Sequence, residues 1–291
     1  MKIGFEKKAR DTEVCIVGLG LIGGSFAKAL KKLPFKKITS CHNEEGTIRR
    51  AIAQGVIDEG SDDPSCVLPS ADFVILCLYP GDSLEFLRKS ASMLKNGSLL
   101  TDTASVKGQY GIEASLLLPE SVRFVMGHPM AGKEGSGFDM SDGDIFHGAS
   151  YILLPTKKSE RGDIDFIKDM AEAIGCSRLI ETDSATHDRM VAYTSALPHA
   201  AAAALVNTQK AAPEDIAPFI GGSFRDASRV ADINVELWTE LFKMNGKNII
   251  EELGRFIAEL EKIKKAVEQN DPLGLRDVFI AAADRRKTLL K

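Results

Sequence analysis

Cysteine is scarce in this sequence, and its thiols are not arranged to bind a metal. No Cys-x-x-Cys pair occurs, and the histidines show no metal-ligand spacing to the cysteines. The number of cysteines, five, is odd. Cys15 and Cys77 lie inside apolar runs, where a buried thiol behaves as a small hydrophobe. This usage fits a reducing cytoplasm and predicts no metal site. The five cysteines are Cys15, Cys41, Cys66, Cys77 and Cys176.

An excess of positive charge is also absent. The chain carries 37 Lys and Arg against 41 Asp and Glu, a formal net charge of −4. Nucleic-acid binding needs clustered basic side chains, so we expect no nucleic-acid partner. The small lysine clusters at 31–32 and 36–37 are typical of a solvated surface.

A leader and long apolar runs are missing as well. The first residues, MKIGFEKKARDTE, contain no apolar core and no small-residue cleavage site, so we expect no signal peptide. No apolar run is long enough to span a bilayer, and we expect no membrane partner. The 291 residues, 44% hydrophobic and 27% charged, favour a soluble cytoplasmic protein of one large or two medium domains.

The first half of the chain alternates apolar runs typical of strands with stretches typical of helices. Strands are expected at 13–17, 37–41, 72–77, 98–101, 122–126 and 151–154. Helices are expected at 25–32, 45–54 and 83–94. This alternation predicts a parallel, doubly wound sheet.

From about residue 183 the chain reads almost entirely as helix. Residues 200–204 are a run of alanine, the best helix former. Further on, apolar residues recur at alternating steps of four and three, which is the seam of a helix packed on other helices. The seam fits an internal core and a subunit interface equally well. Its members are Ile249, Leu253, Phe256, Leu260, Ile263 and Val267.

A glycine loop lies between the first expected strand and the first expected helix. It reads Gly18-Leu19-Gly20-Leu21-Ile22-Gly23, which is G-x-G-x-x-G in the context that a dinucleotide site requires. The first glycine permits the tight turn and the second lets a pyrophosphate approach the backbone. The third allows close packing of helix on strand, and the helix N-terminus faces the negative charge.

The acid that usually follows this loop is missing. A dinucleotide site that prefers NAD carries Asp or Glu about twenty residues further on, bonded to the ribose 2′-hydroxyl. Here His42 and Asn43 follow the second strand, and the acids come later, at Glu44 and Glu45. NAD and NADP therefore both remain open, since His42 or the arginines at 49–50 would tolerate a 2′-phosphate. Leu78 and Tyr79, after the strand at 72–77, are placed in the cofactor site as well.

Five blocks, read together, resemble prephenate dehydrogenase and its arogenate-using relatives. They are GLGLIGGS at 18–25, TDTASVKG at 101–108, GHPMAG at 127–132, SALPHA at 195–200 and GGSFRDASRVA at 221–231, in family order over nearly the whole chain. The resemblance implies a Rossmann-type dinucleotide-binding domain at 1–182, followed by an all-α domain at 183–291 that forms a homodimer. It also implies oxidative decarboxylation of prephenate to 4-hydroxyphenylpyruvate, the precursor of tyrosine, with hydride transfer to NAD or NADP.

The resemblance assigns His128, in GHPMAG, as the base that accepts the substrate's 4-hydroxyl proton. Imidazole suits this role because its ordinary pKa lies near neutral pH, and Pro129 restricts the backbone before it to extended conformations. On spacing alone, a structural histidine bonded to a loop is the favoured interpretation, and the family resemblance is what favours the base. The resemblance implies that Ser105 orients the base and contacts substrate and cofactor; the alternative is a helix N-cap, and the two roles are compatible.

Substrate anchoring is expected from the helical half. Prephenate is a dianion, and a guanidinium gives bidentate bonds to a carboxylate. The resemblance assigns this role to Arg229, which matches the family's substrate arginine; the alternative is a salt bridge on a helix surface. The remaining expected substrate residues are His199, His187, Glu134 and Trp238. Trp238, the single tryptophan, fits a place beside the pocket and a place in the core equally well.

The sequence departs from the family pattern at two points. Ala196 stands where relatives often have histidine, and Lys133 where many have Thr or Ser. The alternatives are an arogenate dehydrogenase, a β-hydroxyacid dehydrogenase using Lys243 or Lys247, and a nucleotide-sensing module without catalysis. The last two leave the GHPMAG block without a role.

Overall fold

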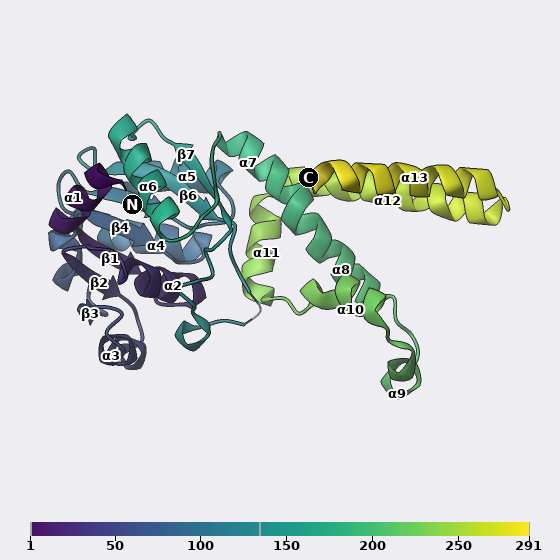
Figure 1. The fold of residues 1–291 in the computed structure, drawn as a ribbon, viewed down its shortest axis with the longest axis horizontal. Coiled ribbons are helices and arrows are strands. Elements are labelled where there is room, and N and C mark those ends of the chain that lie inside the picture. Colours follow the sequence, from purple (N-terminus) through teal and green to yellow (C-terminus); the bar gives the residue numbers. More distant parts are fainter. Residues whose placement is uncertain (1, 134, 291) are drawn as a thin grey trace. The chain divides into compact units, whose positions relative to one another are not determined.

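The computed structural model describes residues 2–133 and 135–290. The first half forms one eight-stranded sheet in the order β3-β2-β1-β4-β5-β6-β7-β8 (Figure 1). The strands are β1 (Glu13–Val17), β2 (Lys37–Cys41), β3 (Glu59–Ser61), β4 (Phe73–Leu76), β5 (Leu99–Asp102), β6 (Arg123–Pro129), β7 (Ser150–Pro155) and β8 (Arg178–Glu181).

Each central strand is apolar throughout because both faces of the sheet are covered. In β1, Val14 and Ile16 belong to one buried cluster, whereas Cys15 and Val17 belong to the other. The first cluster is closed by α1 (Ile3–Asp11), α2 (Leu21–Leu30), α3 (Glu45–Ala53) and α6 (Arg161–Ala173). The second is closed by α4 (Pro80–Ser90), α5 (Gly108–Leu117) and α11 (Val235–Met244).

The prediction of a parallel sheet is wrong at one edge. Strands β1 to β6 are parallel, but β7 pairs antiparallel with β6, and β8 runs parallel to β7. A parallel return needs a crossover of a dozen or more residues, usually through an α-helix. In its described residues, the connection from β6 to β7 has no α-helix and one 3-10 turn, Phe138–Met140, and the chain turns back along the same edge.

Helices make up the rest of the chain. They are α7 (Ser184–Val191), α8 (Leu197–Asn207), α9 (Pro213–Ile216), α10 (Gly222–Ser228), α12 (Gly246–Glu268) and α13 (Pro272–Leu289). A π-helical turn, Ala192–Ala196, joins α7 to α8. Pro198 follows it and has no backbone N–H, which favours a break in the α-helical ladder one turn earlier. None of the described helices is both long and apolar enough to cross a membrane.

The chain forms two compact units that differ from the predicted division at 182–183. The first unit comprises Met1–Val191 and Asp232–Met244, and the second comprises Ala192–Ala231 and Asn245–Lys291. Thus α7 and α11 belong with the sheet. The reason is burial: Asp188 of α7 and Leu241 of α11 are buried in the first unit. A helical periodicity gives no sign of which unit the helix packs on.

Candidate active site

The sheet order creates a crevice at the carboxyl ends of β1 and β4. From β1 the chain first winds outward through β2 and β3, then returns to β4 on the other side of β1. Ligands of open α/β sheets bind at such a switch point. The glycine loop follows β1, and Leu78 and Tyr79 follow β4, so the expected cofactor residues line the same crevice.

The three glycines are needed for different reasons. Gly18 has φ +91°, and a Cβ there would lie 2.7 Å from the Cys77 carbonyl oxygen. A Cβ on Gly23 would lie 1.8 Å from the Gly18 carbonyl oxygen. Apart from its chain neighbours, no atom of the described residues lies within 4 Å of a Cβ placed on Gly20, which is also the N-cap of α2 and offers no side-chain cap. The open space and the uncapped N–H groups fit a dinucleotide pyrophosphate.

His42 takes the position where an acid is common. Its Nδ1 accepts a long hydrogen bond, 3.4 Å, from the backbone N–H of Leu19 in the glycine loop. Burial lowers the pKa of His42, and the nearby charge of Arg50 lowers it further, against the opposing effect of Glu44. A neutral ring that accepts at Nδ1 carries its proton on Nε2, so this side of the crevice presents an N–H donor rather than a carboxylate.

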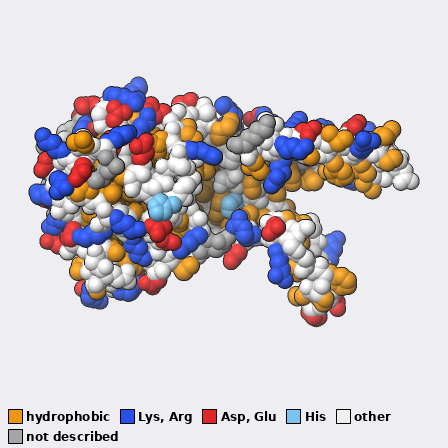
Figure 2. All heavy atoms as spheres, in the orientation of Figure 1, with side chains coloured by type: hydrophobic (Ala, Val, Ile, Leu, Met, Phe, Trp, Pro, Cys, Tyr) orange, Lys and Arg blue, Asp and Glu red, His pale blue; other side chains and the backbone are white. Residues whose placement is uncertain are grey.

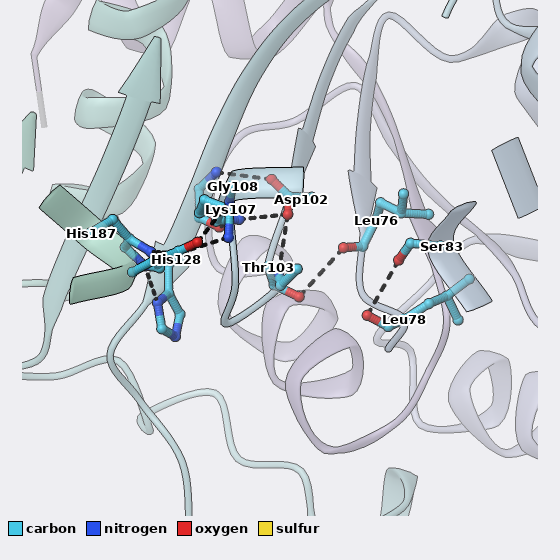
Figure 3. A network of polar contacts seen from close by, with 12 residues as sticks. Leu76, Leu78, Ser83, Asp102, Thr103, Lys107, Gly108, His128 and His187 are labelled. Carbon is cyan, nitrogen blue, oxygen red and sulfur yellow. Dashed lines mark hydrogen bonds and ion pairs between the residues drawn. The ribbon is translucent and has the colours of Figure 1, made fainter. Parts of the chain in front are cut away.

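A buried ion pair continues the sheet beyond the end of β5. Strand β6 pairs with β5 only as far as Val125. Beyond it, Asp102 Oδ1 accepts from the Gly127 N–H at 3.1 Å, and Lys107 Nζ donates to the Gly127 carbonyl at 2.7 Å (Figure 3). Lys107 Nζ also donates to Asp102 Oδ2 at 2.5 Å. Both side chains are fully buried, so the pair replaces the missing strand bonds and fixes the residue before His128.

His128 itself is part of the strand. It pairs with Ile152 across β6 and β7, and β6 ends at Pro129. The sequence predicted the strand only to Met126, with the histidine just beyond it. The extension matters because a strand fixes the backbone more tightly than a loop, and the ring therefore projects from a rigid element.

A relay of side chains connects His128 through His187, both labelled in Figure 3, to the carboxylate of Asp188. The Nδ1 atom of His128 lies 2.8 Å from Nε2 of His187, whose own Nδ1 lies 2.7 Å from Asp188 Oδ1. Asp188 also accepts from the backbone N–H groups of Lys107, at 2.9 Å, and Gly108, at 2.8 Å. The same carboxylate therefore caps the N-terminus of α5 and fixes the orientation of the His187 ring.

The relay determines which nitrogen of His128 is basic. Because a carboxylate only accepts, His187 donates from Nδ1 and, when neutral, accepts at Nε2. His128 must then donate from Nδ1, which leaves the lone pair on its Nε2. Burial lowers the pKa of His128 well below its usual range, and the electrostatic interactions with His187 and Lys107 lower it further. His128 is therefore neutral, with Nε2 ready to take a proton.

Ser105 lies in the bend between β5 and α5 and is partly buried. The hydrogen bond described for the His128 ring goes to His187 and not to Ser105. The alternative role of Ser105 as the N-cap of α5 is wrong, since that position belongs to Lys107 and its N–H bonds Asp188. The expected contact of Ser105 with substrate and cofactor stays a prediction.

The remaining expected substrate residues lie in different places. Trp238, on α11, packs against the second cluster of the sheet, and its ring lies 6.1 Å from that of Phe242. Glu134 lies outside the described residues. His187 is brought to the base, as described above. Among the described residues, no three His, Cys, Asp or Glu side chains gather to hold a metal ion.

His199 and Arg229 are neighbours in the second unit. His199 Nδ1 donates to the Ser195 carbonyl at 2.8 Å, which leaves Nε2 as its acceptor. Burial lowers the pKa of His199, and the Arg229 charge lowers it further, whereas the bond to Ser195 raises it. Arg229 is exposed at the end of α10, as a guanidinium that binds a ligand must be.

Three of the residues above had no assigned role in the chemistry. Asp188 follows His187 directly, and a carboxylate beside a histidine is a local sign of an orienting group. Lys107 and Asp102 both lie in the TDTASVKG block. Their opposite charges, five positions apart, were the feature of the sequence that could have indicated an ion pair. That the pair is buried depends on β6, which is distant in sequence.

Comparison with known proteins places this geometry in a family. The profile of the prephenate dehydrogenase nucleotide-binding domain matches residues 26–180, and that of the dimerization domain matches residues 183–280. The chain belongs to the prephenate dehydrogenase family. It is 32% identical to the prephenate dehydrogenase of Bacillus subtilis over 286 residues, 96% of this chain and 76% of that protein.

The chain is also similar to further members of the prephenate dehydrogenase family. The cyclohexadienyl dehydrogenase of Zymomonas mobilis is 33% identical over 264 residues, 89% of each chain. The crystal structure of A. aeolicus prephenate dehydrogenase, in complex with hydroxyphenyl propionate and NAD+, matches with a TM-score of 0.88. It is 31% identical, and the match covers 96% of this chain and 98% of that one. The expected family, its NAD(P)-dependent dehydrogenase class and the two-part fold are confirmed.

Proposed function

We propose that this member of the prephenate dehydrogenase family oxidatively decarboxylates prephenate, with His128 as the base. The observation that carries the proposal is the relay through His187 to Asp188, which leaves the lone pair on His128 Nε2. The relatives named above are prephenate and cyclohexadienyl dehydrogenases, and one of them binds NAD+ together with hydroxyphenyl propionate. A β-hydroxyacid dehydrogenase would leave this relay without a purpose.

For this reaction the protein needs to supply a base and to hold substrate and cofactor in a fixed geometry. A nicotinamide dinucleotide held in the crevice would supply the hydride acceptor for C4 of the substrate. His128 takes the hydroxyl proton at Nε2 as the C4 carbonyl forms. Loss of CO2 from C1 then supplies the electron pair that makes the ring aromatic, and the resulting 4-oxyanion takes the proton back from His128. The charge gained by His128 is stabilised through His187 by Asp188, as in other relays of this type. Lys107 and Asp102 keep the strand beneath the base in register.

Anchoring of the substrate is assigned to the second unit. Arg229 would bind a substrate carboxylate, and His199 Nε2 would accept a hydrogen bond or pair with the substrate when protonated. We expect Arg229→Ala to raise the KM for prephenate by about one to two orders of magnitude, because a charge-assisted bidentate bond is lost. Arg225→Ala is the matched control, since Arg225 is an exposed arginine on the same helical segment. An unchanged KM in Arg229→Ala would remove the assignment.

For the cofactor, we propose that NADP+ is accepted as well as NAD+. The two acids that follow β2 are engaged on their own helix: Glu44 bonds the Thr47 hydroxyl, and Glu45 pairs with Arg49. No carboxylate stands at position 42 to repel a 2′-phosphate. We expect His42→Asp to shift the ratio of kcat/KM values toward NAD+ by at least about tenfold, because a charge next to a phosphate costs more than 1.4 kcal/mol. If the ratio of the kcat/KM values for NAD+ and NADP+ is unchanged, His42 does not determine cofactor preference.

We further propose a homodimer formed through the second unit. The α12–α13 hairpin exposes many large apolar side chains, and Figure 2 shows hydrophobic groups along it on the face in view. An apolar surface of this extent is typical of an interface. Sedimentation of the purified chain tests this. The exposed apolar side chains of these two helices are Ile250, Ile257, Leu260, Val267, Leu273, Phe279, Ile280 and Leu289.

The deciding experiment measures formation of reduced nicotinamide from prephenate and from arogenate, each with NAD+ and NADP+. We expect turnover of prephenate by the wild-type chain and loss of nearly all turnover in His128→Asn. Asparagine keeps a polar group but cannot take up a proton. If only arogenate is turned over, arogenate becomes the assigned substrate and His128 remains the assigned base. No turnover with either, from a protein that binds dinucleotide, would end the proposal.

A further inference from the structure

One segment of the chain leaves the second unit and returns to it. Residues 232–244, here called the strap, belong to the first unit, although the chain on both sides belongs to the second. The strap contains α11, whose apolar side packs on the same cluster as α4 and β4. Leu241 is buried there, and Leu237 and Trp238 pack beside it. The strap is therefore anchored to the sheet by burial of apolar surface.

Two polar side chains of the strap bind the residues that follow β4. Glu240 Oε1 accepts from the backbone N–H of Gly81 at 2.5 Å. Asn234 Nδ2 donates to the Tyr79 hydroxyl at 2.9 Å. Helix α4 begins at Pro80, and its own N-cap residue gives no side-chain cap. The cap of α4 is thus a carboxylate from 159 residues further along the chain.

The residues held in this way form one wall of the dinucleotide crevice. β4 lies next to β1 in the sheet, so the turn after β4 faces the glycine loop. The contact is tight: a Cβ on Gly18 would lie 2.7 Å from Leu78 Cδ2 and 2.7 Å from the Cys77 carbonyl oxygen. Any shift of the turn at 78–81 would change the width of the site at Gly18.

The charge of Glu240 bears on where an anion can bind. The helices that follow β1 and β4 both begin at the same edge of the sheet, and each N-terminus attracts negative charge. At α2 no side chain caps the N-terminus, whereas at α4 the Glu240 carboxylate already occupies it. A dinucleotide pyrophosphate therefore meets one open helix N-terminus and one that is closed to anions.

We propose that Glu240 and Asn234 are positioning residues for the dinucleotide, acting through the turn at 78–81. The inference rests on the proposed dehydrogenase function, but it concerns cofactor binding and not the chemical step. Glu240 sets the place of the α4 N-terminus, and Asn234 fixes Tyr79. The strap begins three residues after Arg229, so the same segment connects the cofactor wall to the expected substrate arginine along the chain.

The test measures the dissociation constant of NAD+ and of NADP+ by calorimetry, and the two KM values by steady-state kinetics. Glu240→Ala removes the acceptor, and we expect it to weaken dinucleotide binding about tenfold while the KM for prephenate changes less than twofold. Glu240→Gln keeps a neutral acceptor of the same shape and should recover most of the affinity. Glu236→Ala, an exposed acid on the same helix, is the matched control and should bind like the wild type.

A second variant, Gly81→Ala, disrupts the same Gly81–Glu240 hydrogen bond by changing the donor residue. A Cβ on Gly81 would lie 2.6 Å from Glu240 Oε1, so Gly81→Ala displaces the carboxylate without altering it. We expect Gly81→Ala to match Glu240→Ala, and the double variant to be no worse than either, because both remove one interaction. Melting temperatures recorded alongside show whether each variant is folded.

The outcomes separate clearly. Unchanged dinucleotide affinity in folded Glu240→Ala and Gly81→Ala overturns the inference, as does equal weakening in Glu236→Ala. Equal increases in both KM values also overturn it, because a general loss of structure would affect both substrates. If the wild-type chain binds no dinucleotide at all, the proposed function fails first. If it binds and turns over normally while the Glu240 variants match it, only the inference fails.

Discussion

Replacing the buried carboxylate of Asp188 by an amide tests the relay with the smallest change in shape. In Asp188→Asn, the Nδ1–H of His187 donates to a neutral oxygen instead of a charged one. Hydrogen bonds to charged groups contribute about 1.5–3 kcal/mol and neutral ones about 1 kcal/mol, so about 1–2 kcal/mol is lost as charge develops on the histidines. At about 1.4 kcal/mol for each tenfold, kcat should fall roughly 5- to 30-fold.

The geometry also predicts how the amide turns. Among the contacts described above, Asp188 Oδ1 accepts from both His187 and the Lys107 N–H, and Oδ2 accepts from the Gly108 N–H. Asparagine has one oxygen, and at the Oδ1 position it keeps the bonds to both His187 and Lys107. Its NH2 group then faces the Gly108 N–H, so α5 loses one cap bond, and the free energy of unfolding should fall by about 1 kcal/mol.

The assay is initial-rate formation of reduced nicotinamide at saturating prephenate and dinucleotide, together with urea unfolding of the same samples. Asp183→Asn is the control, since it makes the same charge change at an exposed position at the start of α7. A folded Asp188→Asn enzyme with wild-type kcat would refute the relay. A fall of about four orders of magnitude would mean that the amide turned the other way and inverted the tautomer of His187.

Three further predictions follow from the site. Gly20→Ala should weaken dinucleotide binding at unchanged stability, since the added Cβ meets no described residue other than its chain neighbours, whereas Gly23→Ala should destabilise the fold; calorimetry and thermal unfolding separate the two. The folded pKa of His128 lies below its usual 6.5, so the unfolded chain binds the proton first. Its contribution to stability is complete above about pH 6.5 and declines as pH falls, by up to about 1.4 kcal/mol per unit; urea unfolding of wild type and His128→Gln at several pH values should show the difference. Lys107→Met leaves Asp102 buried without its partner, and we expect a loss of about 3–5 kcal/mol in unfolding free energy, partly restored in the double variant with Asp102→Asn.

The sequence was most informative where the signal is local. The expected strand at 13–17 is β1 to the residue, because its apolar run is short and bounded by polar residues and glycine. The glycine loop follows it as expected, since its spacing encodes a turn and a helix start. Helix α1 was missed: Ile3–Asp11 buries only Phe5 and Ala9, too few apolar positions to show a period.

Features that depend on distant partners were beyond the sequence. An apolar strand pattern is the same for either chain direction, so the antiparallel pairing of β7 was not visible at 151–154. Edge strand β8 is mostly exposed and shows no alternation. The seam on α12 was correctly expected to be helical, but it runs from buried Ile249 to exposed Val267, and periodicity alone does not say what covers the exposed end.

In the site, residue types were easier to predict than contacts. His128 and His187 were both expected near the substrate, and the structure brings their rings together. Their shared carboxylate was not expected, because Asp188 becomes significant only once α7 reaches the N-terminus of α5. Ser105 illustrates the opposite error, since a serine before a helix suggests a cap that the structure assigns elsewhere.

The extension of β6 past the end of β5 has a consequence for how such an enzyme changes over time. Because the base stands on the strand and not on the loop after Pro129, substitutions at exposed positions of that loop, such as Met130 and Met140, leave its position unaltered. Such positions are therefore free to vary without loss of the base, whereas Phe138 and Phe146 of the same loop are held in the core. A single residue inserted inside β6 would have the opposite effect, since it turns every later side chain of the strand to the other face and removes His128 from the crevice.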